Sequence, residues 1–274
     1  MTGASIVEQK KEPSQQQQPD LFGQVHPHET DALIARTLAE FSVAIEKDGR
    51  QHTNEFLLLF LRSEVFDVPL AVRRYKKYWK QREAVFGPTA EIKLTTPSEH
   101  RARASNVFRL LPVRHATGRA IVHFRPAQVD TSFTDYSRQC ITRVFWTVLH
   151  EALLTTTVQQ KGILVLTDVS DFGRHQFDRT VVQNILKGMQ GAIPMRLSAH
   201  FVCYPPAFLQ LILPFVLPLV HQRLRNRIKF QFASTPGQMR EQLAAYGLGA
   251  EHLPRELGGS LPAAAEEEQE QTPC

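Results

Sequence analysis

The stretch from residue 205 to residue 220 constrains this chain most, because nearly all of its 16 residues are apolar. Burying one Leu or Phe side chain is worth about 1.5–3 kcal/mol. Such a run must therefore lie in a core, enter a membrane or close over an apolar guest. A membrane-spanning helix needs about 20 residues, and this stretch also contains Gln210, Pro214 and Pro218. It is too short and too interrupted to predict a transmembrane helix.

The same stretch predicts a movable element. Its apolar residues would cover the whole circumference of a helix, whereas a helix resting on one side of a sheet needs only one apolar face. We therefore expect something apolar on its outer side as well. Pro214 and Pro218 would each remove an interior hydrogen bond at a cost of about 3 kcal/mol. A weakened helix suits a lid, since elements that open come from the low-stability end of a structure.

Predicted strands and helices alternate around this stretch. Residues 163–167 form a continuous apolar run, typical of a strand buried on both faces. Further strands are predicted at 119–125, 195–203 and 228–232, and a helix at 177–190. This order predicts an α/β sheet with crossover helices.

Two helix starts carry their own signals. Ser132 and Asp135 have the spacing of a capping box. Thr235 and Pro236 combine an N-cap residue with proline at the first helical position. We therefore expect helices to begin at both places. The buried face of the first would hold Phe133, Ser137, Cys140, Val144, Val148 and Ala152.

Composition divides the chain into four parts. Residues 1–29 are polar and glutamine-rich, and we expect them to be disordered. Residues 30–90 predict a small helical bundle, 91–262 the α/β domain, and 263–274 an acidic, disordered tail. The helices of the bundle are expected at 31–47, 54–63 and 68–82.

Cysteine usage and charge narrow the function classes. The three cysteines have no Cys-x-x-Cys or metal-ligand spacing, which argues against a disulfide framework and a zinc site. No apolar leader opens the chain, so a reducing, cytoplasmic compartment is expected. The net charge of +5 rises to +9 without the four glutamates of the tail, and this favours anionic surfaces. Basic residues are not interleaved with exposed aromatics, so we expect no nucleic-acid partner.

Catalytic motifs are absent from the sequence. It contains no Gly-x-Ser-x-Gly, no phosphate-binding Walker loop and no His-Glu-x-x-His. Asp168 and Asp171, at the end of a predicted strand, come nearest to a catalytic carboxylate pair, because α/β active sites gather at carboxyl ends of strands. Their spacing matches no phosphoryl-transfer pattern. We therefore predict no catalytic residue, no metal site and no enzymatic activity. A hydrolase that uses Asp168 is kept as an alternative to the two main hypotheses given below.

Several segments together resemble the CRAL-TRIO lipid-binding family, in its branch with cellular retinaldehyde-binding protein and α-tocopherol transfer protein. The matching segments, in order, are 57–62, Phe66 with Asp67, Tyr78 with Trp79, 162–168 with Gly173, 193–197, Pro206 with the apolar stretch to Lys229, and 253–259. The resemblance covers roughly residues 30 to 262 and implies a mixed sheet flanked by helices, with a helical gate over an apolar cavity.

The resemblance implies that this cavity encloses one lipid, with no cofactor besides it. The apolar stretch would be the gate, and alternate strand residues would line the cavity. A shift of one residue in register would exchange one set of lining residues for the other. The predicted gate residues are Phe208, Leu211, Ile212, Phe215 and Val216, and the predicted lining residues are Phe124, Val165, Phe201 and Cys203.

The resemblance also implies a basic cleft for phosphoinositide headgroups at Arg196, Arg223 and Arg227, with Ser198 replacing a further basic residue. From the residues themselves, Arg223 and Arg227 would share one helix face, and a guanidinium suits phosphate oxygens. The alternative is that these arginines only complement the carboxyl end of a helix.

Two functional hypotheses follow. The first is a non-enzymatic, monomeric protein of the cytoplasm that docks peripherally on phosphoinositide-bearing membranes and transfers or presents one hydrophobic lipid. The second is a membrane-sensing adaptor that binds phosphoinositide and transfers no lipid. The sequence does not name the lipid.

Overall fold

The computed structural model describes residues 19–88, 91–216, 218 and 220–262, except for the side chains of Ile212 and Phe215. The predicted disorder of residues 1–18 and 263–274 concerns segments outside these described residues.

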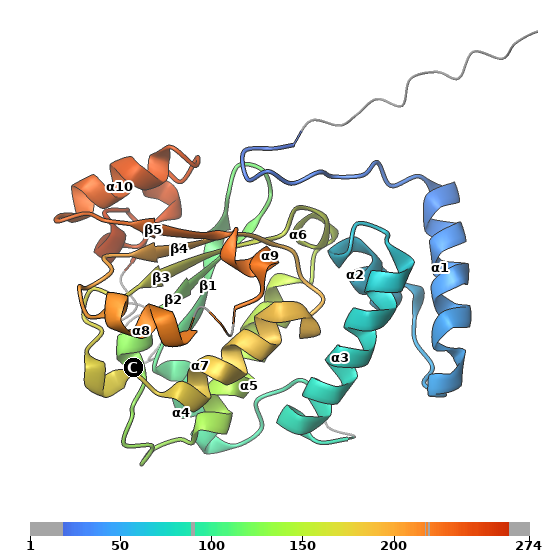
Figure 1. Ribbon diagram of the computed structural model, residues 1–274, viewed down its shortest axis with the longest axis horizontal. Coiled ribbons are helices and arrows are strands. Elements are labelled where there is room, and N and C mark those ends of the chain that lie inside the picture. The colour runs from blue at the N-terminus through green and yellow to red at the C-terminus, as the bar shows by residue number, and fades with distance from the viewer. Residues whose placement is uncertain (1–18, 89–90, 217, 219, 263–274) are drawn as a thin grey trace, which may run out of the picture.

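A five-stranded mixed sheet forms the centre of the molecule (Figure 1). Its strands lie in chain order, with β1 antiparallel to β2 and the other neighbours parallel. This confirms the predicted fold class. The strands are β1 (Phe108–Arg114), β2 (Ala120–Phe124), β3 (Ile163–Asp168), β4 (Leu197–Cys203) and β5 (Ile228–Gln231).

Helices cover the sheet on both faces. Parallel neighbours require crossover connections, and helices between successive strands supply them. In Figure 1, α10 lies above the sheet, and α5, α7 and α8 lie below it. The crossover helices are α5 (Arg138–Ala152), α6 (Thr156–Lys161), α7 (Arg179–Lys187), α8 (Leu209–Val216) and α9 (Gln222–Arg225); α4 (Pro97–Ala104) precedes the sheet and α10 (Pro236–Ala244) follows it.

Register decides which face each strand residue meets. Val165 of β3 pairs with Val122 and His200, whereas Leu166 pairs with His123 and Phe201. Successive strand residues point to opposite faces, so these two rows are separated by the sheet. Two apolar clusters result, one with α3, α5 and α7, and one with α10 and the chain after it.

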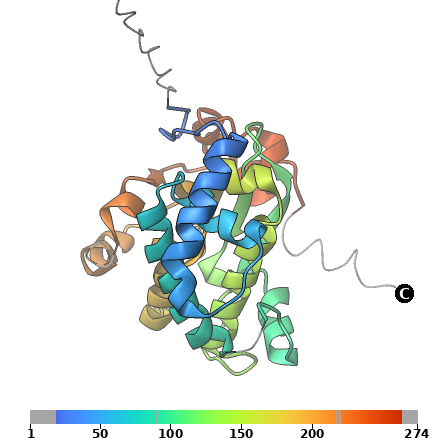
Figure 2. The same cartoon turned by 90° about the vertical axis from the view of Figure 1, so that its right-hand side faces the viewer.

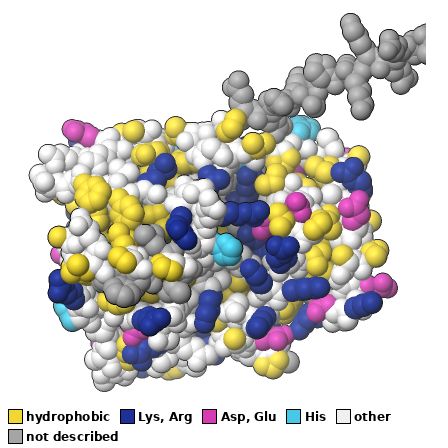
Figure 3. All heavy atoms as spheres, viewed as in Figure 1, with side chains coloured by type: hydrophobic (Ala, Val, Ile, Leu, Met, Phe, Trp, Pro, Cys, Tyr) yellow, Lys and Arg dark blue, Asp and Glu magenta, His cyan; other side chains and the backbone are white. Residues whose placement is uncertain are grey.

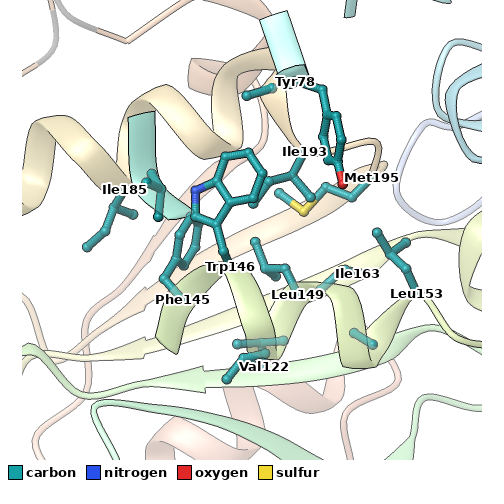
Figure 4. Packing of buried hydrophobic residues seen from close by; sticks show 14 of the residues in the cluster. Tyr78, Val122, Phe145, Trp146, Leu149, Leu153, Ile163, Ile185, Ile193 and Met195 are labelled. Atoms are coloured by element: carbon teal, nitrogen blue, oxygen red, sulfur yellow. The ribbon is translucent and has the colours of Figure 1, made fainter. Parts of the chain in front are cut away.

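Three helices precede the sheet domain, as predicted: α1 (Asp31–Ile45), α2 (Asn54–Ser63) and α3 (Val68–Phe86). Side chains of Thr30, Thr53 and Asp67 cap their amino ends. Figure 2 shows α1 on the outside of this group. α3 packs on the sheet domain through Tyr78, whose ring centroid lies 5.7 Å from that of Trp146 in α5 (Figure 4). The bundle and the sheet therefore share one core.

Two local expectations differ from the structure. α5 begins at Arg138, with Ser137 as its cap, so the predicted start at Ser132 is wrong. The Ser132 hydroxyl instead donates to Asp130 at 2.6 Å, because a short polar side chain equally favours a turn. β1 was not predicted, since Pro112 and its mixed pattern conceal an edge strand.

The described part of the amino-terminal segment is packed on the sheet domain. Residues 20–26, which we call the N-terminal strap, bury Phe22 against the α10 side of the sheet. The Gln24 side chain donates to the Leu197 carbonyl at 3.1 Å. The expectation of disorder over 1–29 is therefore wrong for this part, because the polar composition conceals one apolar anchor and several hydrogen-bonding groups.

An ion pair fastens the strap. The carboxylate of Asp20 accepts hydrogen bonds from the fully buried guanidinium of Arg119 and from His26 Nε2, the latter at 2.6 Å. Burial alone would raise the pKa of Asp20, but the bonds from His26, the Gln24 amide and Arg119 outweigh it and hold this pKa well below its usual value.

Asp20→Asn should lower the free energy of unfolding at pH 7 by about 1–3 kcal/mol, because it leaves the buried Arg119 charge uncompensated. Since the pKa of Asp20 is depressed on folding, its contribution is full above about pH 4 and is lost as pH falls through the folded-state pKa. Denaturant unfolding at several pH values measures the difference, which should shrink in acid. Glu91→Gln, at a side chain that is 70% exposed, is the control. An Asp20 variant as stable as wild type at pH 7 would contradict the account.

Candidate functional site

An apolar cavity lies between the sheet and helices α7 and α8. The volume of this cavity is about 210 Å³. All five strands contribute, through Phe108, Val122, Phe124, Val165, Thr167, His200, Val202, Ile228 and Phe230. The helices α7, α8 and α9 contribute Val181, Val182, Ile185, Leu186, Leu209, Leu213, Val216 and Leu224.

Helix α8 closes one side of this cavity. Leu209, Leu213 and Val216 recur at helical spacing and line it. Leu211 points away and is 61% exposed. Pro214 lies inside the helix, where it can donate no hydrogen bond to the preceding turn. The helix is therefore apolar on both faces and internally weakened.

The predicted lining residues divide by sheet face. Phe124 and Val165 line the cavity. The prediction for Phe201 and Cys203 is wrong, because both side chains are fully buried on the α10 side of the sheet. In β4 the residues facing the cavity are His200 and Val202. Both faces of this strand are covered, one by the cavity and one by the α10 side of the molecule, so the alternation of its residues did not show which row lines the cavity.

The predicted gate residues also divide. Val216 lines the cavity. Phe208 lies beside it, with its ring centroid 6.0 Å from that of the lining residue Phe172, and Leu211 faces outward. Ile212 and Phe215 fall outside the described side chains. Leu209 and Leu213 were not among the predicted residues, although an i, i+4 pattern begun one residue after Phe208 would have included both.

A second, basic pocket opens on the surface between α3 and α9. Arg196, Arg223 and Arg227 all line it, so the structure brings the three predicted arginines together. Arg223 and Arg227 do not share a helix face as predicted, however, because α9 is a single turn that ends at Arg225. Helix α3 adds Arg73, Arg74 and Lys77. Figure 3 shows Lys and Arg side chains gathered across the middle of this face.

The three arginines are not equally available. Arg196 is only 8% exposed, and it donates to the carbonyls of Gln160 and Val25 at 2.9 and 2.8 Å. Burial, with repulsion from Arg119, lowers the pKa of Arg196 to about 10. It remains charged at neutral pH.

Arg227 and Arg223 also differ in how available their charges are to a ligand. Arg227 donates to the carbonyl of Phe22 in the strap. Arg223 has a side chain that is 77% exposed, with Nη1 3.4 Å from Glu64. Arg196 and Arg227 thus hold the strap, whereas Arg223 presents its charge to solvent together with the exposed Arg73 and Lys77 of α3.

The Asp168 carboxylate is held in place by neighbouring groups of the protein. Its carboxylate accepts from the amide and hydroxyl of Ser170 at 3.0 and 2.8 Å, and Arg125 Nε lies 3.9 Å away. Burial raises the pKa of Asp168. Among the described residues, no group of three or more His, Cys, Asp or Glu side chains is placed to hold a metal ion.

None of the helices in the described ranges is long and apolar enough to cross a bilayer.

The residues from 106 to 259 match the model of the CRAL/TRIO domain, which is more than half of the chain. The chain therefore belongs to the CRAL/TRIO domain family. The fold agrees, since the crystal structure of Sfh5 superposes with a TM-score of 0.56 over 89% of this chain and 99% of that one. The two are 10% identical, so this likeness concerns the fold alone.

Curated relatives are distant and longer. Clavesin-1 of Xenopus laevis is 24% identical over 76% of this chain and 61% of its own length. Tyrosine-protein phosphatase non-receptor type 9 of Homo sapiens is 24% identical over 90% of this chain and 40% of its own length. The chain thus spans less than two thirds of either relative.

Proposed function

We propose that this protein binds one hydrophobic lipid in the cavity beneath α8 and carries or presents it at phosphoinositide-bearing membranes, without catalysing a reaction. The observation that carries the proposal is the cavity itself, whose walls are almost entirely apolar. Each methylene buried there is worth about 0.8 kcal/mol, so a long hydrocarbon chain would be held firmly. The protein would act as a monomer that associates peripherally with membranes from the cytoplasm.

Helix α8 is the proposed gate. It lines the cavity with Leu209, Leu213 and Val216 and is weakened at Pro214. Leu211 on its outer face is exposed, as is Phe232, whose ring stacks near that of Phe230. Exposed apolar patches mark membrane or protein contacts. In Figure 3 hydrophobic side chains gather on the left of the face whose centre carries the basic pocket.

The basic pocket is the proposed headgroup site. Arg223, Arg73 and Lys77 are the exposed cations that favour it. Arg196 and Arg227 would take part only after giving up their bonds to the strap. The adaptor hypothesis keeps this pocket but assigns no transfer, so vesicle-to-vesicle transfer separates the two functions.

Val202→Trp should fill the cavity and lower lipid uptake from donor vesicles by more than about tenfold, because excluding two methylenes already removes about 1.6 kcal/mol. Transfer of a fluorescent lipid to acceptor vesicles measures it. Leu154→Trp places the same side chain at a position that is 80% exposed and should transfer normally. Equal transfer by both variants would contradict a lipid site in this cavity.

Arg73→Ala combined with Arg223→Ala should weaken binding to vesicles containing phosphatidylinositol phosphates roughly thirtyfold at low salt, since each basic residue near such a surface contributes about 1 kcal/mol. Co-sedimentation measures the binding, and the difference should narrow as salt screens the charges. Arg36→Ala with Arg240→Ala removes the same net charge from exposed positions elsewhere. If both double variants bind alike, the docking site is misplaced.

A further inference from the structure

Two polar side chains face each other inside the largely apolar cavity. Thr167 of β3 and His200 of β4 both line it, and Thr167 Oγ1 lies 2.7 Å from His200 Nε2. Their strands are paired in parallel, and both residues belong to the row of side chains that includes Val165 and Val202. The pair therefore belongs to the sheet floor opposite α8.

The other polar groups of the lining already have partners within the protein. Gln176 accepts from the Gly173 amide and donates to the Ala127 carbonyl, each at 2.7 Å. Asp178 caps α7 through the Val181 amide and accepts from Arg138 at 2.7 Å. By contrast, His200 Nδ1 makes no hydrogen bond within the described residues.

The pair is uncharged and adaptable. Desolvation lowers the pKa of His200 to about 4, so its ring is neutral at physiological pH. If the Thr167 hydroxyl donates to Nε2, then Nδ1 carries the proton and donates. If Nε2 donates to Thr167, then Nδ1 accepts and the hydroxyl proton is available. Either arrangement leaves at least one donor and one acceptor for a guest.

The cavity suits an uncharged guest. None of its described lining residues is Lys or Arg. A phosphate or carboxylate beside this pair would be desolvated without a countercharge, which is costly. A hydroxyl group costs far less, because it can both donate and accept and so matches either arrangement of the pair.

We propose that Thr167 and His200 form the polar anchor for the hydroxyl group of an uncharged lipid alcohol, an assignment that rests on the lipid-binding function proposed above. The hydrocarbon part of the alcohol lies against the apolar side chains of α7 and α8. The basic pocket then serves membrane headgroups, and the cavity takes a lipid of a different class.

The test uses the full-length protein and two probes with the same number of heavy atoms, hexadecan-1-ol and heptadecane, each supplied in phosphatidylcholine vesicles. Native mass spectrometry of the re-isolated protein gives the ratio of bound alcohol to bound hydrocarbon. Comparing this ratio between variants cancels the unequal partition of the probes into the vesicles. The variants are His200→Phe and Thr167→Val, and the control is His123→Phe, a buried histidine of β2 on the opposite face of the sheet.

Wild type and His123→Phe should show the same ratio, and His200→Phe should lower it by about tenfold, with Thr167→Val between them, since one hydrogen bond is worth about that factor. Two variants at different residues guard against a loss caused by misfolding, which thermal unfolding reveals. An unchanged ratio in both folded cavity variants, or phosphatidylcholine as the preferred bound lipid, overturns the anchor while leaving the lipid-binding function intact. Binding of no lipid by wild type overturns both.

Discussion

The structure depends on one packing constraint, namely that the lower face of the sheet is covered by helices but not filled by them. On the α10 side, Leu166 and Phe201 meet Met239 and Leu243 with no exposed surface. On the other side, α8 stands away from the strands and leaves an apolar space. Side chains around an unfilled space lose the dispersion contacts that a close-packed interior supplies. The proposed hydrophobic guest would restore these contacts and so would compensate for the weakness of the helix that covers this face.

A second constraint is set by two guanidinium groups that lie beside the amino ends of parallel strands. Arg119 and Arg196 are buried near the start of β2 and β4, where charge cannot remain unpaired. The strap supplies the partners, through the Asp20 carboxylate and the Val25 carbonyl. These two arginines are therefore part of the folded core, and the proposed membrane contact would depend mainly on exposed cations of α3 and α9.

The sequence predicted the parts of the structure that local signals determine. Helices α2 and α10 begin where Thr53 and Thr235 cap them, and β3 lies where its apolar run predicted. Family resemblance predicted the sheet with the apolar helix beside it, as the strand order and the cavity lined by both bear out. Such features can be predicted from residues that are adjacent in the sequence or from the order of the family's motifs.

The wrong or missing predictions concern features that depend on contacts between segments far apart in the sequence. β4 is covered on both faces, so the choice between Phe201 and His200 depended on pairing with β3. The buried strap was hidden because Phe22 is its single large anchor, and its polar groups meet partners far along the chain, such as Arg119. The Thr167 and His200 pair was missed for the same reason, since 33 residues separate two side chains that touch only across strands.

Native mass spectrometry of the purified protein with no lipid added, followed by organic extraction, tests the central claim most directly. A cavity that needs a guest should carry one from the expression host, so we predict a discrete added mass that extracts as a single lipid class. A mass equal to the bare polypeptide, unchanged after incubation with mixed membranes, would contradict the account and favour the adaptor.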